Sequence, residues 1–165
     1  MSAPQLAHIL IPEIVPSKLA PPQLTFKAIA FGILLALLFA SANAYLGLFA
    51  GMTVSASIPA AVISMGMLKL FRDSNILENN IAQTAASAGE SVAAGAIFTL
   101  PALILLGYWD SFQYWWVCAI TGLGGLLGVL FTIPLRRSLI LQQALPYPEG
   151  TATAEVLRMG DTPDA

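Results

Sequence analysis

Long apolar stretches dominate the chain and alternate with short polar or proline-containing segments. Because a hydrocarbon core about 30 Å thick requires roughly twenty apolar residues in a helix, each stretch is long enough to cross a membrane. The pattern therefore predicts an all-α integral membrane protein with about four transmembrane helices. These predicted spans are residues 26–49, 52–71, 81–107 and 115–135.

Two proline-containing segments modify this pattern. Pro59 falls inside the second span and predicts a kinked or discontinuous helix there, of which a simple kink is the commoner outcome. After the fourth span, Pro146 and Pro148 end one helix and begin another, predicted over residues 149–159. If that last helix is re-entrant, its open N-terminal amides form an anion site. If it is cytoplasmic, Glu149 merely complements the helix dipole, and spacing alone favours this second interpretation.

Composition excludes several classes of protein. Charged residues make up 10% of the chain and hydrophobic residues 57%, which cannot provide a water-soluble surface. The seven basic residues are scattered, so no basic stripe is available to bind nucleic acid. One cysteine and one histidine, His8, provide neither a disulfide nor a metal cluster. Since no nucleophile with a base is visible within the spans, an enzyme is not expected.

The basic residues fall at one end of the predicted spans, which sets the orientation. The chain is thus expected to be multi-pass, with a cytoplasmic N-terminus and a proline-rich cytoplasmic tail at residues 1–24. An aromatic belt around Asp110 marks the opposite interface. The basic residues concerned are Lys18, Lys27, Lys69, Arg72, Arg136 and Arg137.

The first half of the third span is polar on one side. At about 100° per residue its polar side chains share an arc of roughly 140°, and alanine and glycine fill the rest. Such a helix packs closely on one side and faces a wet cavity on the other, and neutral donors and acceptors suit peptide-like groups. The polar stripe consists of Asn79, Asn80, Gln83, Thr84, Ser87, Glu90 and Ser91.

Glu90 is the most unusual member of the stripe. A charged side chain near the middle of a span costs about 2.5–3.5 kcal/mol. No lysine or arginine lies in the middle of any span, so Glu90 is protonated, open to water or paired with a residue outside this chain. Reversible protonation would make it an ion-coupling residue; the alternative is a neutral carboxyl group bonded to a neighbouring helix. Glu78 fits equally a functional role and a capping box with Asn75.

Two segments carry a family likeness: ENNIAQTAASAGESVAAGAIFTLPALILLG at residues 78–107 and LPYPEGTATAEVL at residues 145–157. Together they resemble the oligopeptide transporter (OPT) family, prokaryotic type, and the likeness covers about residues 25–161. Members have many more spans than four, so the resemblance implies that residues 25–165 are the N-terminal part of a polytopic transporter whose remaining spans complete it. The matching candidate residues for substrate or coupling are Glu78, Asn79, Asn80, Gln83, Thr84, Ser87, Glu90, Tyr147, Glu149 and Gly150.

The resemblance also implies a function. It suggests secondary active, proton-coupled uptake of small oligopeptides across the cell membrane, which for a prokaryotic member is the bacterial inner membrane. The proton is the expected coupling ion, and no cofactor is expected. Two alternatives remain: transport of metal–chelator complexes, as in the yellow stripe-like branch, or a non-transporting membrane assembly subunit.

Overall fold

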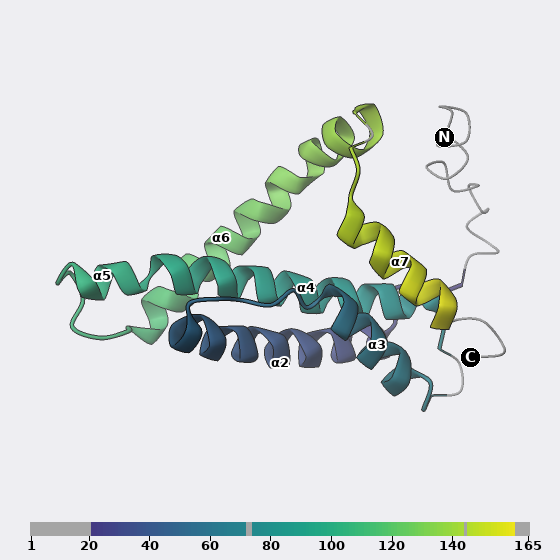
Figure 1. Cartoon of the computed structure of the whole chain (residues 1–165), viewed down its shortest axis with the longest axis horizontal. Helices are drawn as coiled ribbons and strands as arrows, with labels where there is room; N and C mark the ends of the chain where they lie inside the picture. Colours follow the sequence, from purple (N-terminus) through teal and green to yellow (C-terminus); the bar gives the residue numbers. More distant parts are fainter. Residues whose placement is uncertain (1–20, 72–73, 144, 161–165) are drawn as a thin grey trace.

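The computed structural model describes residues 21–71, 74–143 and 145–160, and regular structure in these ranges is entirely helical. His8, Lys18, Arg72 and all but residues 21–24 of the proline-rich tail lie outside the described residues. In chain order (Figure 1) the elements are α2 (Phe26–Ala50), α3 (Ser57–Leu68), α4 (Ile76–Thr99), α5 (Pro101–Leu105), α6 (Tyr114–Leu135), the π-helix η1 (Arg136–Gln142) and α7 (Pro148–Gly160).

Three helical segments are long and apolar enough to cross a membrane: Phe26–Ala50, Ile76–Leu105 and Tyr114–Gln142. The shortest has 25 residues and is therefore about 37 Å long, more than the hydrocarbon core requires. They confirm the all-α membrane architecture and three of the predicted spans. The predicted second span over residues 52–71, expected to be kinked or discontinuous, contains only the 12-residue helix α3.

The chain between α2 and α3 is extended rather than helical. Helix α2 ends at Gly51, whose φ of 69° is left-handed and whose N–H donates to the carbonyl of Gly47 over 3.1 Å. Residues 52–56 have no helical assignment, and α3 begins at Ser57, so Pro59 lies in its first turn. A proline costs no hydrogen bond there. The predicted kink is therefore absent, and the discontinuity lies before Pro59.

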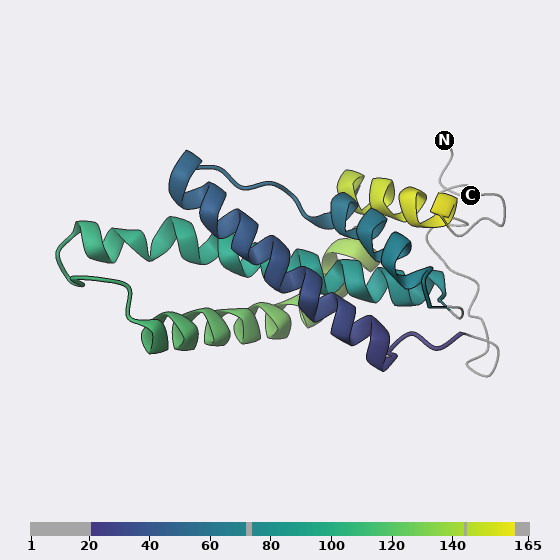
Figure 2. The same cartoon turned by 90° about the horizontal axis from the view of Figure 1, so that it is seen from below.

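Helices α2 and α4 run in the same direction and cross along their length (Figure 2). Thr25, at the start of α2, donates a hydrogen bond to Glu78 at the start of α4, and Gly47 near the end of α2 lies against Ile97. The chain must therefore return along the pair between them. A short extended stretch at about 3.3 Å per residue, followed by α3 at about 1.5 Å per residue, covers roughly the length of α2.

Close packing of α2 on α4 depends on small residues. An added Cβ at Gly89 would lie 2.8 Å from the Cβ of Ala36, and one at Gly32 would lie 2.9 Å from the Cβ of Ala85. Such positions let two helix backbones approach closely. Ala60 of α3 joins this pair, and Leu35, Ala60 and Ala86 form a buried core of the three helices.

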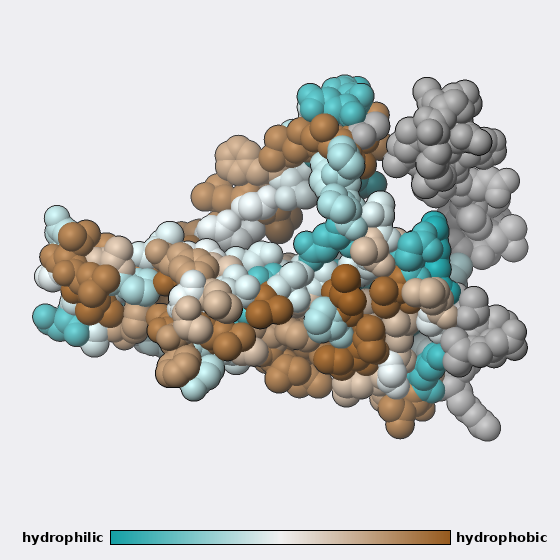
Figure 3. Space-filling model, viewed as in Figure 1, coloured by the Kyte–Doolittle hydropathy of each residue, from teal (hydrophilic) through white to brown (hydrophobic). Residues whose placement is uncertain are grey.

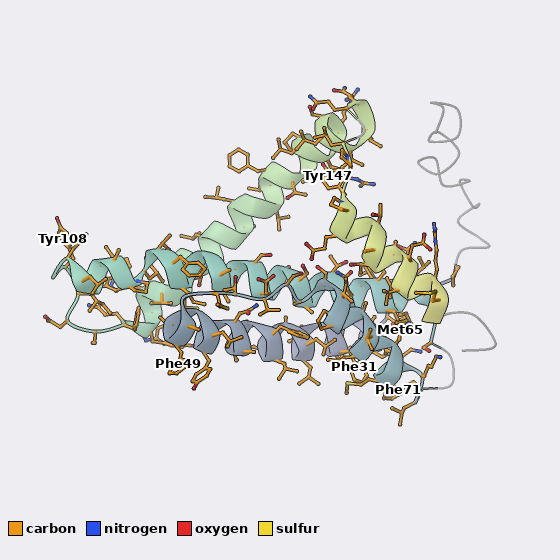
Figure 4. All side chains as sticks on the ribbon, viewed as in Figure 1. Phe31, Phe49, Met65, Phe71, Tyr108 and Tyr147 are labelled. Carbon is orange, nitrogen blue, oxygen red and sulfur yellow. The ribbon has the colours of Figure 1, made fainter. Side chains whose placement is uncertain are left out.

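Helix α7 packs on α3 through a second core. It contains Ala61, Met65 and Leu157, and Gly160 at the end of α7 lies directly against Met65. Figure 4 labels Met65, Phe31 and Phe71 toward the end of the molecule where α2 begins, and the rings of Phe31 and Phe71 are 5.6 Å apart. Helix α7 thus covers the side of α3 and α4 near that end.

Helix α6 diverges from the others and has no buried residue (Figure 1). Hydrophobic surface continues over α2, α3 and α6, while hydrophilic surface gathers at the end of α6 and along α7 (Figure 3). This distribution is the inverse of a soluble protein and fits helices surrounded by lipid or by further apolar helices.

Replacing Gly89 by valine should destabilise the protein by about 1–3 kcal/mol, because the new side chain overlaps Ala36. The measurement is thermal unfolding in detergent. The matched control is Gly95→Val on the same helix, where an added Cβ meets nothing within 4 Å. Equal stability of the two variants would contradict the close α2–α4 contact.

Candidate functional site

The candidate site lies at the middle of α4, where two helices begin. Glu90 stands halfway along the apolar segment Ile76–Leu105 and is half-buried. The hydroxyl of Ser87, one turn earlier, lies 3.3 Å from the hydroxyl of Ser57, the first residue of α3. Ser55 in the extended segment donates a hydrogen bond to the carboxylate of Glu149 at the start of α7. We call Ser55, Ser57, Ser87, Glu90 and Glu149 the midspan site.

The extended segment that supplies Ser55 is held by one side chain of α2. The amide of Asn43 donates to the carbonyl of Val54 over 2.8 Å and accepts from the N–H of Val54 over 2.9 Å. Asn43 is only 2% exposed, so its amide is held inside the protein, whereas Val54 is exposed. Non-helical backbone at membrane depth must be satisfied by protein or by water, and here Asn43 satisfies it. The sequence analysis missed this residue, although an asparagine inside so apolar a stretch was a visible signal.

The environment of Glu149 favours its ionised form. The pKa of Glu149 lies below its usual value because the hydroxyls of Ser55 and Ser57 donate to its carboxylate. Glu149 also stands in the first turn of α7, where helix dipoles favour negative charge. The spacing in the sequence favoured a role for Glu149 only as a charge that complements the helix dipole. In the structure its carboxylate also links α7 to the segment that leads into α3.

Glu90 faces a charge of the same sign. Glu149 lies close enough to interact with Glu90 electrostatically, although the two residues belong to different helices. No ion pair is recorded for Glu90 among the described residues. Protonation, exposure to water and a partner outside this chain were the three alternatives predicted for Glu90, and this carboxylate neighbour was not among them. Two carboxylates of like charge repel one another when both are ionised.

A pocket of about 380 Å³ extends from the midspan site between α3, α4 and α7. It brings together four of the residues predicted from sequence: Asn80 and Gln83 from the stripe, and Glu149 and Gly150 from α7. Tyr147 lies in the turn directly before α7 (Figure 4), and a Cβ added at Gly150 would lie 3.7 Å from the Cβ of Tyr147. The two family-like segments therefore meet in one place, although they are far apart in the sequence.

Other members of the stripe have different surroundings. Glu78 is fully buried, forms the capping box with Asn75 and lies 3.4 Å from the ammonium group of Lys27. This confirms the capping interpretation and places Glu78 outside the pocket. Thr84 donates to the carbonyl of Asn80 on its own helix. Asn79 is 7% exposed, and its Oδ1 has no hydrogen-bond partner among the described residues.

A second groove, of about 500 Å³, separates α4 from α6. Its threonine hydroxyls bond to carbonyls of their own helices, as Thr99 does to Gly95 and Thr132 to Gly128. These hydroxyls are already satisfied, so the groove presents mainly small apolar groups. It suits helix packing better than recognition of a polar ligand. Within the described ranges, no group of three or more histidine, cysteine, aspartate or glutamate side chains is arranged to hold a metal ion.

Comparison with known proteins places this arrangement in context. A family described as OPT oligopeptide transporter protein matches residues 23–165. A putative oligopeptide transporter of Haemophilus influenzae is 54% identical over 120 residues, covering 73% of this chain and 19% of that protein. The metal-nicotianamine transporter YSL3 of Arabidopsis thaliana is 29% identical over 177 residues, covering 88% of this chain and 26% of the relative.

A more distant relative is the putative oligopeptide transporter YGL114W of Saccharomyces cerevisiae, 27% identical over 161 residues and covering 86% of this chain. The chain spans about a fifth to a quarter of the length of the curated relatives that it matches. No solved structure matches this chain.

Replacing Asn43 by leucine should leave the N–H and the carbonyl of Val54 without their hydrogen bonds, because leucine cannot form either one. Each buried group left unsatisfied costs about 1–3 kcal/mol. The measurement is hydrogen exchange at residues 52–56 in detergent, which should become faster. The control is Ala42→Leu on the exposed side of the same helix. Unchanged exchange in the Asn43 variant would remove this residue from its supporting role.

Acid should weaken the attachment of α7. Since the pKa of Glu149 is depressed in the folded protein, the stabilisation is fully present above the ordinary glutamate pKa of about 4.3 and is lost as pH falls through the depressed value. The measurement is the distance between spin labels at the exposed positions Ala152 and Val62, in a cysteine-free background.

The control for this titration is Ser55→Ala, which removes a hydroxyl that stabilises the ionised carboxylate. The change in label distance should then begin at a higher pH than in the parent protein. An identical titration in both proteins would show that the Ser55–Glu149 hydrogen bond does not hold α7 in place.

Proposed function

This chain belongs to the OPT oligopeptide transporter family. From this we propose that the protein containing it takes up small oligopeptides together with protons. The family consists of membrane transporters, so the chain is part of a multi-pass transport protein and not an enzyme. Oligopeptides are proposed as the substrate because the relative with 54% identity is named a putative oligopeptide transporter. Residues 25–165 would be one part of a longer transport domain, following a cytoplasmic tail at residues 1–24.

The observation that supports the coupling proposal is that the carboxylate of Glu149 is hydrogen-bonded and that of Glu90 is not, among the described residues. Glu149 accepts a hydrogen bond from the hydroxyl of Ser55, which stabilises it as an anion. Among the described residues, Glu90 has no recorded hydrogen bond to its carboxylate, and it lies at the middle of an apolar segment. A proton that binds to Glu90 removes both the repulsion from Glu149 and the cost of a charge at membrane depth. Glu90 is therefore the proposed proton carrier.

The pocket next to this pair is the proposed substrate site. The side-chain amides of Asn80 and Gln83 line it, and amides both donate to and accept from peptide groups. The same pocket is bounded by the first residues of α3 and α7. Helix termini and extended backbone beside a central cavity are the features on which many secondary transporters rely. Occupation of the pocket and protonation of Glu90 would thus affect one another directly.

Four crossings with a cytoplasmic N-terminus are the proposed topology. Since α2 and α4 are parallel, residues 51–71 form the return crossing, half extended and half helical (Figure 2). Lys27, Lys69, Arg136 and Arg137 then fall at the same end of the bundle, which supports a cytoplasmic assignment for that end. In a bacterium this membrane would be the inner membrane.

Metal–chelator transport is the second candidate function, because three plant relatives are named as established or probable metal-nicotianamine transporters. Nicotianamine carries carboxylates and amines, so the polar pocket is compatible with it. The higher identity of the bacterial relative favours peptides for this chain. Direct competition between a labelled peptide and an iron–nicotianamine complex separates the two functions.

Glu90→Gln should abolish accumulation of labelled tetrapeptides driven by an inward proton gradient, because glutamine cannot take up and release a proton. The measurement uses the complete protein in proteoliposomes, and accumulation should fall at least tenfold. Counterflow exchange of peptide without a gradient should persist. Asp110→Asn, at an exposed position before α6, is the control that should transport normally.

Gradient-driven accumulation by the Glu90 variant at the parent level would refute the coupling role. Absence of uptake of every peptide by the parent protein, together with uptake of iron–nicotianamine, would replace the peptide proposal with the chelate one.

A further inference from the structure

The pocket between α3, α4 and α7 has opposite charges at its two ends. Glu149 lines it at the start of α7 and Arg158 lines it near the end of the same helix. Nine positions of an α-helix separate them, which is about 13.5 Å along the helix axis. The pocket is therefore electrically polar along its length, with its negative end next to Glu90.

Between the two ends, the lining carries no other charged side chain among the residues that form the pocket. Asn80 and Gln83 from α4 and Thr153 from α7 provide neutral polar groups there. Ile76, Leu77 and Leu157 provide apolar surface alongside them. A complementary ligand has a cation at one end, an anion at the other and uncharged polar and apolar groups between.

Arg158 is able to serve as the anion-binding end. One of its N–H groups donates to Glu155 over 2.9 Å, and both side chains are largely exposed. An exposed pair of this spacing contributes little, so it is easily given up. The guanidinium group has five N–H donors in a planar arrangement that matches a carboxylate, which leaves donors free for a ligand.

Glu149 is the corresponding cation-binding end. Ser55 donates a hydrogen bond to its carboxylate, and the negative charge of Glu90 on α4 acts on it as well. One ammonium group and one proton would together neutralise the two carboxylates. A cationic ligand group at this end is thus compatible with simultaneous binding of a proton.

We propose that Arg158 binds the C-terminal carboxylate and Glu149 the N-terminal ammonium group of an extended zwitterionic peptide in this pocket. An extended chain advances about 3.3–3.6 Å per residue, so the separation of the two ends corresponds to a peptide of about four residues. The inference rests on the proposed peptide transport and adds the residues that recognise the two peptide termini. Peptides with a blocked terminus should then be poor substrates.

The experiment compares uptake of a labelled tetrapeptide with a free C-terminus and the same tetrapeptide as its C-terminal amide. The complete protein is reconstituted in proteoliposomes with an inward proton gradient. The parent protein should take up the free acid with a KM at least tenfold lower than the amide. Arg158→Gln should raise the KM for the acid to that of the amide and leave amide uptake unchanged, which also shows that the variant is folded.

Two further variants make the test specific. Arg158→Lys should retain part of the preference, because an ammonium group still attracts a carboxylate but cannot bind it in the same planar geometry. Arg137→Gln, an arginine outside the pocket, should retain the full preference.

An unchanged preference for the acid in the Arg158→Gln protein would overturn the inference, as would equal uptake of acid and amide by the parent protein. Failure of the proposed function has a different signature, since the parent protein would then take up neither tetrapeptide while still transporting a metal chelate.

Discussion

The arrangement of the whole site depends on the pair of hydrogen bonds between Asn43 and the peptide group of Val54. Unpaired backbone is costly in a membrane, and this side chain allows the chain to be extended where a helix would otherwise be required. Because the chain is extended there, α3 begins at mid-depth and not at a surface. Its first residues then reach both Ser87 on α4 and the carboxylate of Glu149 on α7.

Much of the architecture could be predicted from sequence because it depends on local properties. Length and hydropathy were sufficient for α2, α4 and α6, the Asn75–Glu78 spacing identified the start of α4, and Pro148 identified the start of α7. In the second span the break was predicted at Pro59 but lies before it, because hydropathy measures the preference for lipid and not the conformation of the backbone. The contacts of Asn43 and of Glu149 were missed because they join segments that are distant in sequence. Those contacts bring the predicted residues of α4 and α7 into one pocket.

Glu78 and Glu90 lie on the same helix but have different neighbours, and their carboxylates therefore have different roles. Glu78 has Lys27, Thr25 and the backbone of Asn75 around its carboxylate, so it holds the ends of α2 and α4 together. Glu90, three turns later, has Glu149 as its charged neighbour. The first carboxylate is fully compensated and structural. The second carboxylate, that of Glu90, has no compensating cation among the described residues, so its protonation can change with its surroundings. The proposed coupling role requires this property.

The extended segment between α2 and α3 also limits which insertions and deletions the protein can accept. In an extended segment, one inserted or deleted residue moves every following side chain to the opposite face, whereas in a loop the change is absorbed locally. Between Gly51 and Ser57 such a change would separate Val54 from Asn43 and turn Ser55 away from α7. We therefore expect this short segment to keep a fixed length among related proteins, even where the connection between α5 and α6 varies freely.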